Sequence, residues 1–221
     1  MELSYWLSRW RKNKIGFHMP EGYPALEPHL KNIPLPKKKT VLVPLCGKSR
    51  DLLTLTRYFD KVIGVEISEK AIREFLQETG LKATEKSFAD FKIFETEPIT
   101  FWCGNFFKLP VRKINPVDLI YDKAALVALP PGRRPEYAEK LLTFCTNSTS
   151  ILVHHFIYKQ DEMPGPPFSV FEKELENYFG DMFSSVVLEE SELNLDTFKK
   201  FQNRGLKSGL RERFILFTTI N

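Results

Sequence analysis

The sequence of 221 residues predicts an α/β fold, a mostly parallel sheet with helices on both faces and an antiparallel last strand. Two continuous apolar runs, "TVLVPL" and "KVIGVEI", are separated by a helix-length segment, as is typical of parallel strands buried on both faces. The last two predicted strands, "SSVVLEES" and "RERFILFTTI", are joined by a segment too short for the helical crossover between parallel strands. The final strand is therefore expected to run antiparallel.

The N-terminal segment is predicted to be an amphipathic helix. Leu3, Trp6, Leu7 and Trp10 recur at i, i+3, i+4 and i+7, which places them on one stripe of a helix that ends near Asn13. We expect residues 1–35 to form a helical lid over a site in a single domain that spans residues 1–221.

The other elements are predicted in chain order from the same periodicities. Ser68 and Gly80 suit the N-cap and the C-cap of one helix. Helices are expected over 25–32, 50–58, 68–80, 133–146, 171–179 and, as a short piece, 195–201, and strands over 40–45, 61–67, 116–122, 149–158, 184–191 and 211–220, with two more strands around a turn within 91–103.

Composition excludes several classes of protein. The net charge is only +4, and the basic clusters at 37–39 and 133–134 are not interleaved with aromatic residues, which argues against nucleic-acid binding. Three widely spaced cysteines without a CxxC pattern argue against disulfides and zinc, and favour a reducing cytoplasm. The N-terminus lacks a signal-peptide pattern and no run approaches 18 apolar residues, so we expect neither secretion nor a membrane span.

A glycine-bearing turn and a lone acidic residue mark the predicted binding site. Open α/β sheets bind ligands at the carboxyl ends of their strands. Glu66 ends a strand and follows Gly47 by 19 residues, close to the ~20-residue spacing at which an acidic side chain binds the ribose hydroxyls of an adenosine cofactor. The alternative is a surface glutamate, which the wholly apolar remainder of "VIGVE" disfavours.

The same turn narrows the choice of cofactor. "LCGKS" matches neither GxGxxG nor GxxxxGK[ST], so pyrophosphate binding is poorly supported, and S-adenosylmethionine is the adenosine cofactor that lacks a diphosphate. No tyrosine has the Lys at +4 of a short-chain dehydrogenase, and no GxSxG occurs. His154 and His155 lie in an apolar strand and are expected to be structural, Cys46 is expected to be a buried thiol, and no metal site is predicted.

Six motifs run in order along nearly the whole chain: "YWLSRW", "GFH", "VPLCGKS", "VIGVEIS", "YDKAALVALPPGRRPEYA" and "PGPPF". With them the sequence resembles the thiopurine S-methyltransferase family. The resemblance implies a Rossmann-like, seven-stranded methyltransferase sheet in a monomer. It also implies methyl transfer from S-adenosylmethionine to the sulfur of a small aromatic or heterocyclic thiol.

The resemblance also implies roles for particular residues. The cofactor-binding set is Trp6, Trp10, Phe17, Leu45, Gly47, Glu66, Asn105, Phe106 and Lys123. The substrate-side set is Phe17, His18, Pro166 and Lys200, and the catalytic candidates are Lys123 and Asp122. Asp122 has two possible roles, a base or orienter of Lys123 and a cap of the following helix, and the cap ranks slightly ahead.

The sequence departs from the family pattern at Lys123, where the family usually has Arg. A lysine keeps the attraction to an anionic thiolate but loses the bidentate donor fork of an arginine. Three alternatives stay open from the residues alone. The scaffold could methylate inorganic selenium or tellurium species, it could methylate small thiols or halides, or it could bind the cofactor without catalysis.

Overall fold

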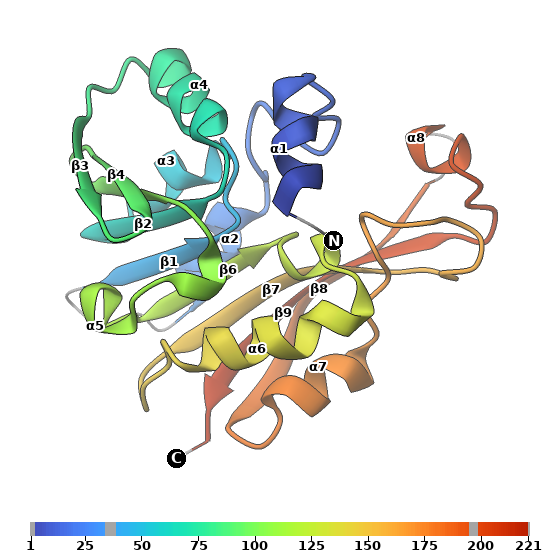
Figure 1. The fold of residues 1–221 in the computed structure, drawn as a ribbon. Helices are drawn as coiled ribbons and strands as arrows, with labels where there is room; N and C mark the ends of the chain where they lie inside the picture. Colours follow the sequence, from blue (N-terminus) through green and yellow to red (C-terminus); the bar gives the residue numbers. More distant parts are fainter. Residues whose placement is uncertain (1–2, 34–38, 195–198, 221) are drawn as a thin grey trace. The chain divides into compact units, whose positions relative to one another are not determined.

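The computed structural model describes residues 3–33, 39–194 and 199–220, in which helices and strands alternate along most of the chain (Figure 1). The strands are β1 (Thr40–Pro44), β2 (Lys61–Glu66), β3 (Thr84–Phe88), β4 (Phe91–Glu95), β5 (Ile99–Cys103), β6 (Leu119–Lys123), β7 (Ser150–Ile157), β8 (Phe183–Leu193) and β9 (Leu210–Thr219). The α-helices are α1 (Leu3–Arg11), α2 (Leu26–Asn32), α3 (Asp51–Leu55), α4 (Glu69–Thr79), α5 (Val111–Ile114), α6 (Arg134–Leu142), α7 (Glu172–Phe179) and α8 (Lys199–Gln202). Three single-turn 3₁₀ helices are η1 (Phe106–Lys108), η2 (Leu126–Ala128) and η3 (Pro131–Arg133). The chain forms two compact units, Met1–Ile120 and Tyr121–Asn221.

The first unit is built on a mixed sheet with strand order β3-β4-β5-β2-β1-β6. The pairs β5–β2, β2–β1 and β1–β6 are parallel, as the apolar runs predicted, whereas β3, β4 and β5 form an antiparallel meander. Glu66 is paired with Cys103 on β5, and Pro44 of β1 is paired with Val65 of β2. The three central strands therefore end side by side.

Helix α4 is specified at both of its ends and along its buried face. The Ser68 hydroxyl accepts the Ala71 N–H at 3.3 Å, and Gly80 closes the helix at φ +72°. Both caps were predicted, and both are confirmed. The apolar face of α4 packs on β2 and β5, where Phe75 meets Phe101 at a centroid distance of 5.2 Å. Figure 1 shows α1 beside α4, on which it packs.

The second unit contains three antiparallel strands in the order β7-β9-β8. Strand β9 is antiparallel to both neighbours, so the prediction for the last strand is confirmed. Helices α6 and α7 lie together (Figure 1). The buried Arg134 of α6 binds both carboxylate oxygens of Glu174 on α7 at 2.9 Å, and Phe179 of α7 packs on Phe217 of β9 at 5.1 Å between centroids.

Two details differ from the expectations. Nine strands occur in the described residues instead of the seven that the resemblance implies. The sequence pattern missed β3, "TEKSF", because all five of its side chains are exposed and it shows no apolar alternation. The short helical piece expected over 195–201 lies partly outside the described residues, and α8 begins at Lys199. Among the described helices, none is long and apolar enough to cross a membrane.

Candidate functional site

The carboxylate of Glu66 is held by the backbone of two turns at the carboxyl end of β2. Its Oε2 accepts the Gly47 N–H at 2.9 Å, and its Oε1 accepts the Ser68 N–H at 2.7 Å. The residue is only 5% exposed. Each oxygen thus accepts one N–H. Since a carboxylate oxygen can accept two donors, this group could also accept both hydroxyls of a vicinal diol.

Burial changes the protonation of Glu66. Desolvation raises the pKa of its carboxyl to about 7, against the lowering effect of the backbone N–H groups of Ser68, Gly47 and, least of the three, Ile67. Near neutral pH the group is therefore divided between the carboxylate and the acid. A ligand that donates hydrogen bonds to it favours the charged form.

The turn after β1 is shaped by two residues in the left-handed region, Leu45 at φ +48° and Gly47 at φ +55°. Trp10 from α1 closes over this turn, since a Cβ built on Gly47 would lie 3.1 Å from the Trp10 Cζ2. A larger residue at 47 would be strained in its backbone and would also push the indole away. The turn and the N-terminal helix are thus in direct contact.

An aromatic cluster extends from Trp10 along the N-terminal segment. Phe17 meets Trp10 at 5.6 Å and Trp6 at 5.5 Å between centroids, both in edge-to-face geometry. Trp10 is 3% exposed, whereas Phe17 is 44% exposed. The cluster therefore has a buried base on the Gly47 turn and an open rim of the kind that could hold a flat ring.

Polar contacts fix the N-terminal segment to the rest of the first unit. The Tyr23 N–H donates to Asp51 Oδ1 at 2.6 Å, and the Lys70 Nζ donates to Asn13 Oδ1 at 2.6 Å. Burial lowers the pKa of the His18 imidazole, and the nearby cation of Lys48 lowers it further.

The sequence reasoning missed the ion pairs of Lys48. Its Nζ lies 2.9 Å from Glu74 Oε2 and 2.7 Å from Glu78 Oε1, and the residue is 8% exposed. The sequence did contain a signal for these ion pairs: a Lys in the predicted turn, and two Glu one helical turn apart in "EFLQETG". The paired ammonium is therefore part of the structure of the turn.

Asn105 and Phe106 follow β5, which neighbours β2 in the sheet. The Asn105 Oδ1 accepts the Phe107 N–H at 3.1 Å and caps η1. The Phe106 side chain is 1% exposed and lies in the core. A ligand at this strand end would thus meet the backbone of Phe106 rather than its ring.

Asp122 is surrounded by donors from its own unit. Its Oδ1 accepts the N–H groups of Ala125 and Leu126 at 2.9 and 3.1 Å, and its Oδ2 accepts the Tyr137 hydroxyl at 2.8 Å. Burial raises the pKa of this carboxyl to about 6, against those three hydrogen bonds. The side chain is 0% exposed, which favours the capping role over that of a base.

Two predicted lysines lie in the second unit: Lys123, predicted to be catalytic and cofactor-binding, and Lys200, predicted for the substrate side. Lys123 is half-buried at the end of β6, and Lys200 is exposed in α8. Burial raises the pKa of the Glu212 carboxyl, but the His154 hydrogen bond and then charges that include those of Lys123 and Lys200 lower it. The sequence reasoning did not single out Glu212. In the strand pattern "RERF", Glu212 is two positions before the buried Phe214, so the two side chains share a face of the strand. An acidic residue on the same face as a buried apolar one was the signal that was missed.

Pro166 lies half-buried in a loop of the second unit. That loop is fixed by the Tyr158 hydroxyl, which donates to the Pro167 carbonyl at 2.7 Å. The place of Pro166 beside a substrate stays a prediction.

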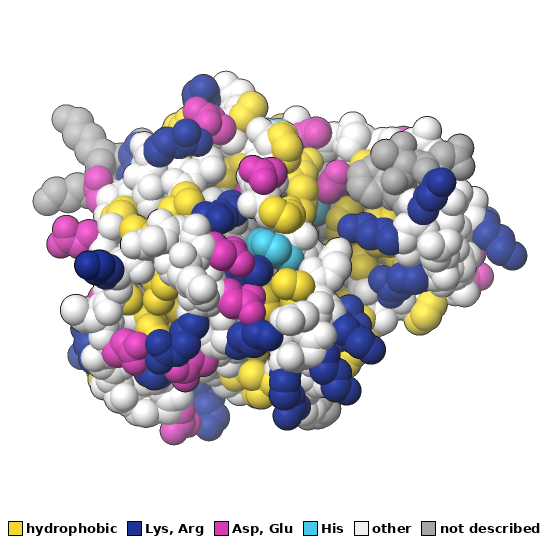
Figure 2. Space-filling view, turned by 90° about the horizontal axis from the view of Figure 1, so that it is seen from above, with side chains coloured by type: hydrophobic (Ala, Val, Ile, Leu, Met, Phe, Trp, Pro, Cys, Tyr) yellow, Lys and Arg dark blue, Asp and Glu magenta, His cyan; other side chains and the backbone are white. Residues whose placement is uncertain are grey.

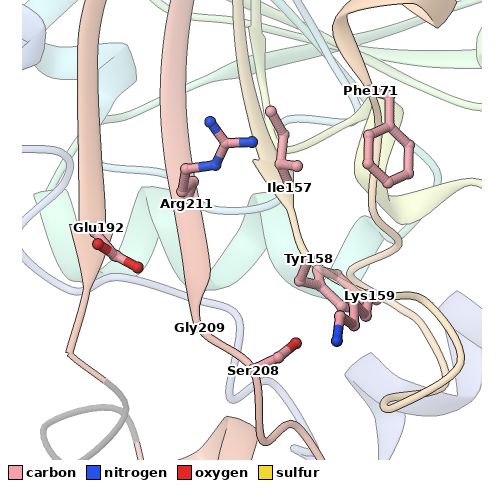
Figure 3. A pocket seen from close by; sticks show the side chains of 8 residues that line it. All are labelled: Ile157, Tyr158, Lys159, Phe171, Glu192, Ser208, Gly209 and Arg211. Atoms are coloured by element: carbon pink, nitrogen blue, oxygen red, sulfur yellow. The ribbon is translucent and has the colours of Figure 1, made fainter.

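A hollow of ≈ 290 Å³ opens elsewhere in the second unit (Figure 3). Its lining residues are Ile157, Tyr158, Lys159, Phe171, Glu192, Ser208, Gly209 and Arg211, a set without any predicted site residue. Arg211 already lies 3.2 Å from the Glu190 carboxylate. Since side chains alternate along β9, Arg211 and Glu212 are on opposite faces, and the hollow is separate from the Glu212 cluster.

Charges of both signs mix over the face of the molecule shown in Figure 2, with hydrophobic side chains between them. This agrees with the small net charge of +4. A face of mixed sign does not favour a polyanionic partner over a small molecule.

Comparison with known proteins gives a consistent result. The family profile described as Thiopurine S-methyltransferase (TPMT) matches residues 1–218. A thiopurine S-methyltransferase of Pseudomonas fluorescens (strain Pf0-1) is 38% identical over 202 residues, 91% of this chain and 93% of that protein. The Nitrosospira multiformis protein of the same name is 38% identical over 219 residues, 99% of each chain.

Solved structures share the fold at low sequence identity. An S-adenosylmethionine-dependent methyltransferase from Anabaena variabilis has a TM-score of 0.65 at 12% identity and covers 99% of this chain and 95% of its own. The Burkholderia thailandensis 1,6-didemethyltoxoflavin-N1-methyltransferase, solved with S-adenosylhomocysteine, has a TM-score of 0.62 at 15% identity, with 98% and 87% covered. The chain therefore belongs to the thiopurine S-methyltransferase family of S-adenosylmethionine-dependent methyltransferases.

Proposed function

We propose that this methyltransferase transfers the methyl group of S-adenosylmethionine to the sulfur of an aromatic or heterocyclic thiol, such as a thiopurine. The observation that carries the proposal is the cluster on the Gly47 turn. A buried carboxylate, Glu66, binds the turn from one element, and the indole of Trp10 packs on the same turn from another. A polar anchor for a cofactor and an aromatic surface for a flat acceptor thus meet at one turn.

The residues present fit the cofactor. Glu66 has the lone pairs to accept both ribose hydroxyls, and the backbone after β1 and β5 lies at the neighbouring strand ends. Glu66, Leu45, Gly47, Asn105 and the backbone of Phe106 would hold it there. When bound, S-adenosylmethionine supplies a methyl group on a sulfonium, which is electrophilic without a metal or a base.

The remaining work of the protein is to position and desolvate the acceptor. Trp6, Trp10 and Phe17 would exclude water and orient a flat ring, and holding reactants in a near-attack geometry can supply roughly 7–11 kcal/mol. Lys123 would favour the thiolate form of the acceptor, since a nearby cation lowers the pKa of a thiol. The carboxylate of Asp122 already accepts the N–H groups of Ala125 and Leu126, and it would take no part in proton transfer.

The test is the formation of S-adenosylhomocysteine with 6-mercaptopurine as acceptor, in the wild type and in Glu66→Ala. We expect turnover in the wild type and its loss in the variant at a cofactor concentration that saturates the wild type. The matched control is Glu69→Ala, three residues further on at the start of α4, where the carboxylate is 43% exposed and pairs with Arg73. That control should retain full turnover.

Assays with other acceptors distinguish the proposed function from the alternatives. Wild-type protein that binds S-adenosylhomocysteine but leaves 6-mercaptopurine unmethylated would contradict the proposal. Turnover on selenite, tellurite or iodide in its place would identify a different acceptor, and no turnover on any of them would identify a cofactor-binding protein without catalysis.

A further inference from the structure

We infer that Lys48 is a positioning residue for the cofactor, because its two ion pairs with helix α4 fix the turn that presents the Gly47 N–H to Glu66. The inference rests on the proposed function in one respect, namely that the cofactor binds Glu66 at this turn. It concerns residues of the first unit alone. Lys48 lies in the motif "VPLCGKS", but the predicted cofactor-binding set does not include it.

The Gly47 turn needs a restraint of its own. Glycine has the widest backbone freedom of any residue, and Gly47 is held at φ +55°. Its N–H donates to Glu66 Oε2 at 2.9 Å, on the same carboxylate that would accept the ribose hydroxyls. One hydrogen bond leaves a turn free to rotate about it, so a second attachment is required to fix the direction of this N–H.

Lys48 supplies that second attachment. Its Nζ lies 2.9 Å from Glu74 Oε2 and 2.7 Å from Glu78 Oε1, and these two glutamates are one helical turn apart on α4. Lys48 is buried, so salt screens these ion pairs less than it screens pairs at the surface. Burial lowers the pKa of the ammonium, but the hydrogen bonds to Glu78 and Glu74 raise it by more, and the cation is retained.

The contacts close into a ring. Glu66 accepts the Gly47 N–H on one oxygen and the Ser68 N–H on the other, and Ser68 is the N-cap of α4. Lys48 then joins the Gly47 turn to Glu74, further along the same helix. The ring fixes the carboxylate between two turns before the cofactor arrives, and such pre-organisation lowers the ordering cost of binding.

The glutamates that hold Lys48 have further partners, which should keep the fold intact without it. Glu74 Oε1 lies 3.5 Å from Lys70 Nζ, and Glu78 Oε2 lies 4.0 Å from Arg50. A variant that lacks the Lys48 ammonium therefore leaves each carboxylate beside a cation. The loss of the buried charge can then be tested in a folded protein.

The experiment measures the Kd of S-adenosylmethionine and of S-adenosylhomocysteine by titration calorimetry in Lys48→Met, which keeps a long unbranched side chain and removes the charge. We expect both Kd values to rise about tenfold, because the hydrogen bonds from the ribose to Glu66 lose their alignment. A positioning role affects both ligands alike, whereas S-adenosylmethionine alone carries the sulfonium cation. By charge alone, the loss of a neighbouring cation would tighten the binding of S-adenosylmethionine.

Three further variants serve as controls. Lys48→Arg keeps the cation and should stay within about threefold of the wild type. Lys92→Met removes a lysine of β4 that also lies between two glutamates, 2.9 Å from Glu69 and 2.8 Å from Glu85, and should leave both Kd values unchanged. Glu74→Gln leaves Lys48 one of its two ion pairs and should raise both Kd values about threefold. It repeats the test in a protein that keeps the buried ammonium.

A second measurement needs no ligand. In the ligand-free protein, amide hydrogen exchange at Gly47, followed by NMR, should become about tenfold faster in Lys48→Met, whereas exchange at Ser68, the other donor to Glu66, should be unchanged. If the wild type binds neither form of the cofactor but this pattern occurs, the proposed function fails and the restraint of the turn stands. The inference is overturned if exchange at Gly47 is unchanged, if Gly47 and Ser68 accelerate alike, or if Lys48→Met binds either ligand as tightly as the wild type.

Discussion

Strands β2 and β6 each end near a buried carboxylate, Glu66 and Asp122, yet the two groups are used differently. Asp122 is 0% exposed and accepts three donors from its own unit, two backbone N–H groups and the Tyr137 hydroxyl. Glu66 accepts the backbone N–H of Gly47 on one oxygen and that of Ser68 on the other. In both cases burial raises the pKa of the carboxyl, to about 7 for Glu66 and about 6 for Asp122.

The difference teaches how to separate a structural from a functional carboxylate. A raised pKa does not distinguish them, because burial alone produces it. What distinguishes them is the source of the donors and the acceptor capacity that remains. Asp122 ties a strand to the helix that follows it, whereas Glu66 joins the turns that follow β1 and β2 and keeps capacity for a diol.

The largest effect is expected when Asp122 is removed. Asp122→Ala would leave two backbone N–H groups and the Tyr137 hydroxyl buried without their acceptor, and we expect the free energy of unfolding to fall by about 4 kcal/mol. Urea unfolding measures it. Tyr137→Phe, which removes one of the three donors, should cost about 1 kcal/mol. An unchanged affinity for S-adenosylhomocysteine in the folded fraction of Asp122→Ala would confirm the contrast, and a weakened one would break it.

The next effect is expected on ligand binding. Glu66→Gln keeps the shape of the side chain but loses the charge that strengthens two hydroxyl hydrogen bonds, so we expect the Kd for S-adenosylmethionine to rise about 100-fold, or ~2.7 kcal/mol. Titration calorimetry gives the value directly. Glu69→Gln is the control with an exposed carboxylate at the start of α4. Equal affinities in the two variants would show that Glu66 is as structural as Asp122.

The smallest of the three effects is on pH dependence. The pKa of Glu66 is raised to about 7, so its proton is bound below that pH and the carboxylate is lost as pH falls through 7. If only the charged form binds the diol, affinity should be level above about pH 8 and fall about fivefold between pH 7 and 6. In Glu66→Gln the same titration should be flat. A pH-independent Kd in the wild type would mean that the acid form binds equally well.

The sequence predicts the first unit well where local chemistry is decisive. The parallel apolar strands, the Ser68 and Gly80 caps and the position of Glu66 at a strand end all follow from patterns of a few residues. Strand β3 could not be predicted, because it is polar and depends on pairing with β4 for its conformation.

The residues of the candidate site also divide into those that local patterns predict and those that depend on contacts between distant segments. Residues that act through their place on the chain, such as Gly47 and Glu66, could be predicted from spacing. Pairs that act across strands could not, since His154 and Glu212 are 58 positions apart and meet only through the register of β7 and β9. Asp122 is an intermediate case. The sequence allows it to be a base or a helix cap, and only the three hydrogen-bond donors around it in the structure favour the cap.

The contacts of α1 also have a consequence for the protein as it is synthesised. A helix of nine residues is too short to persist alone in water. Its indole contact is to Gly47, and the segment after it is held by Asp51 and Lys70. During synthesis this helix therefore has no surface to dock on until the chain through Lys70 has left the ribosome. Until then its two tryptophans are available to chaperones.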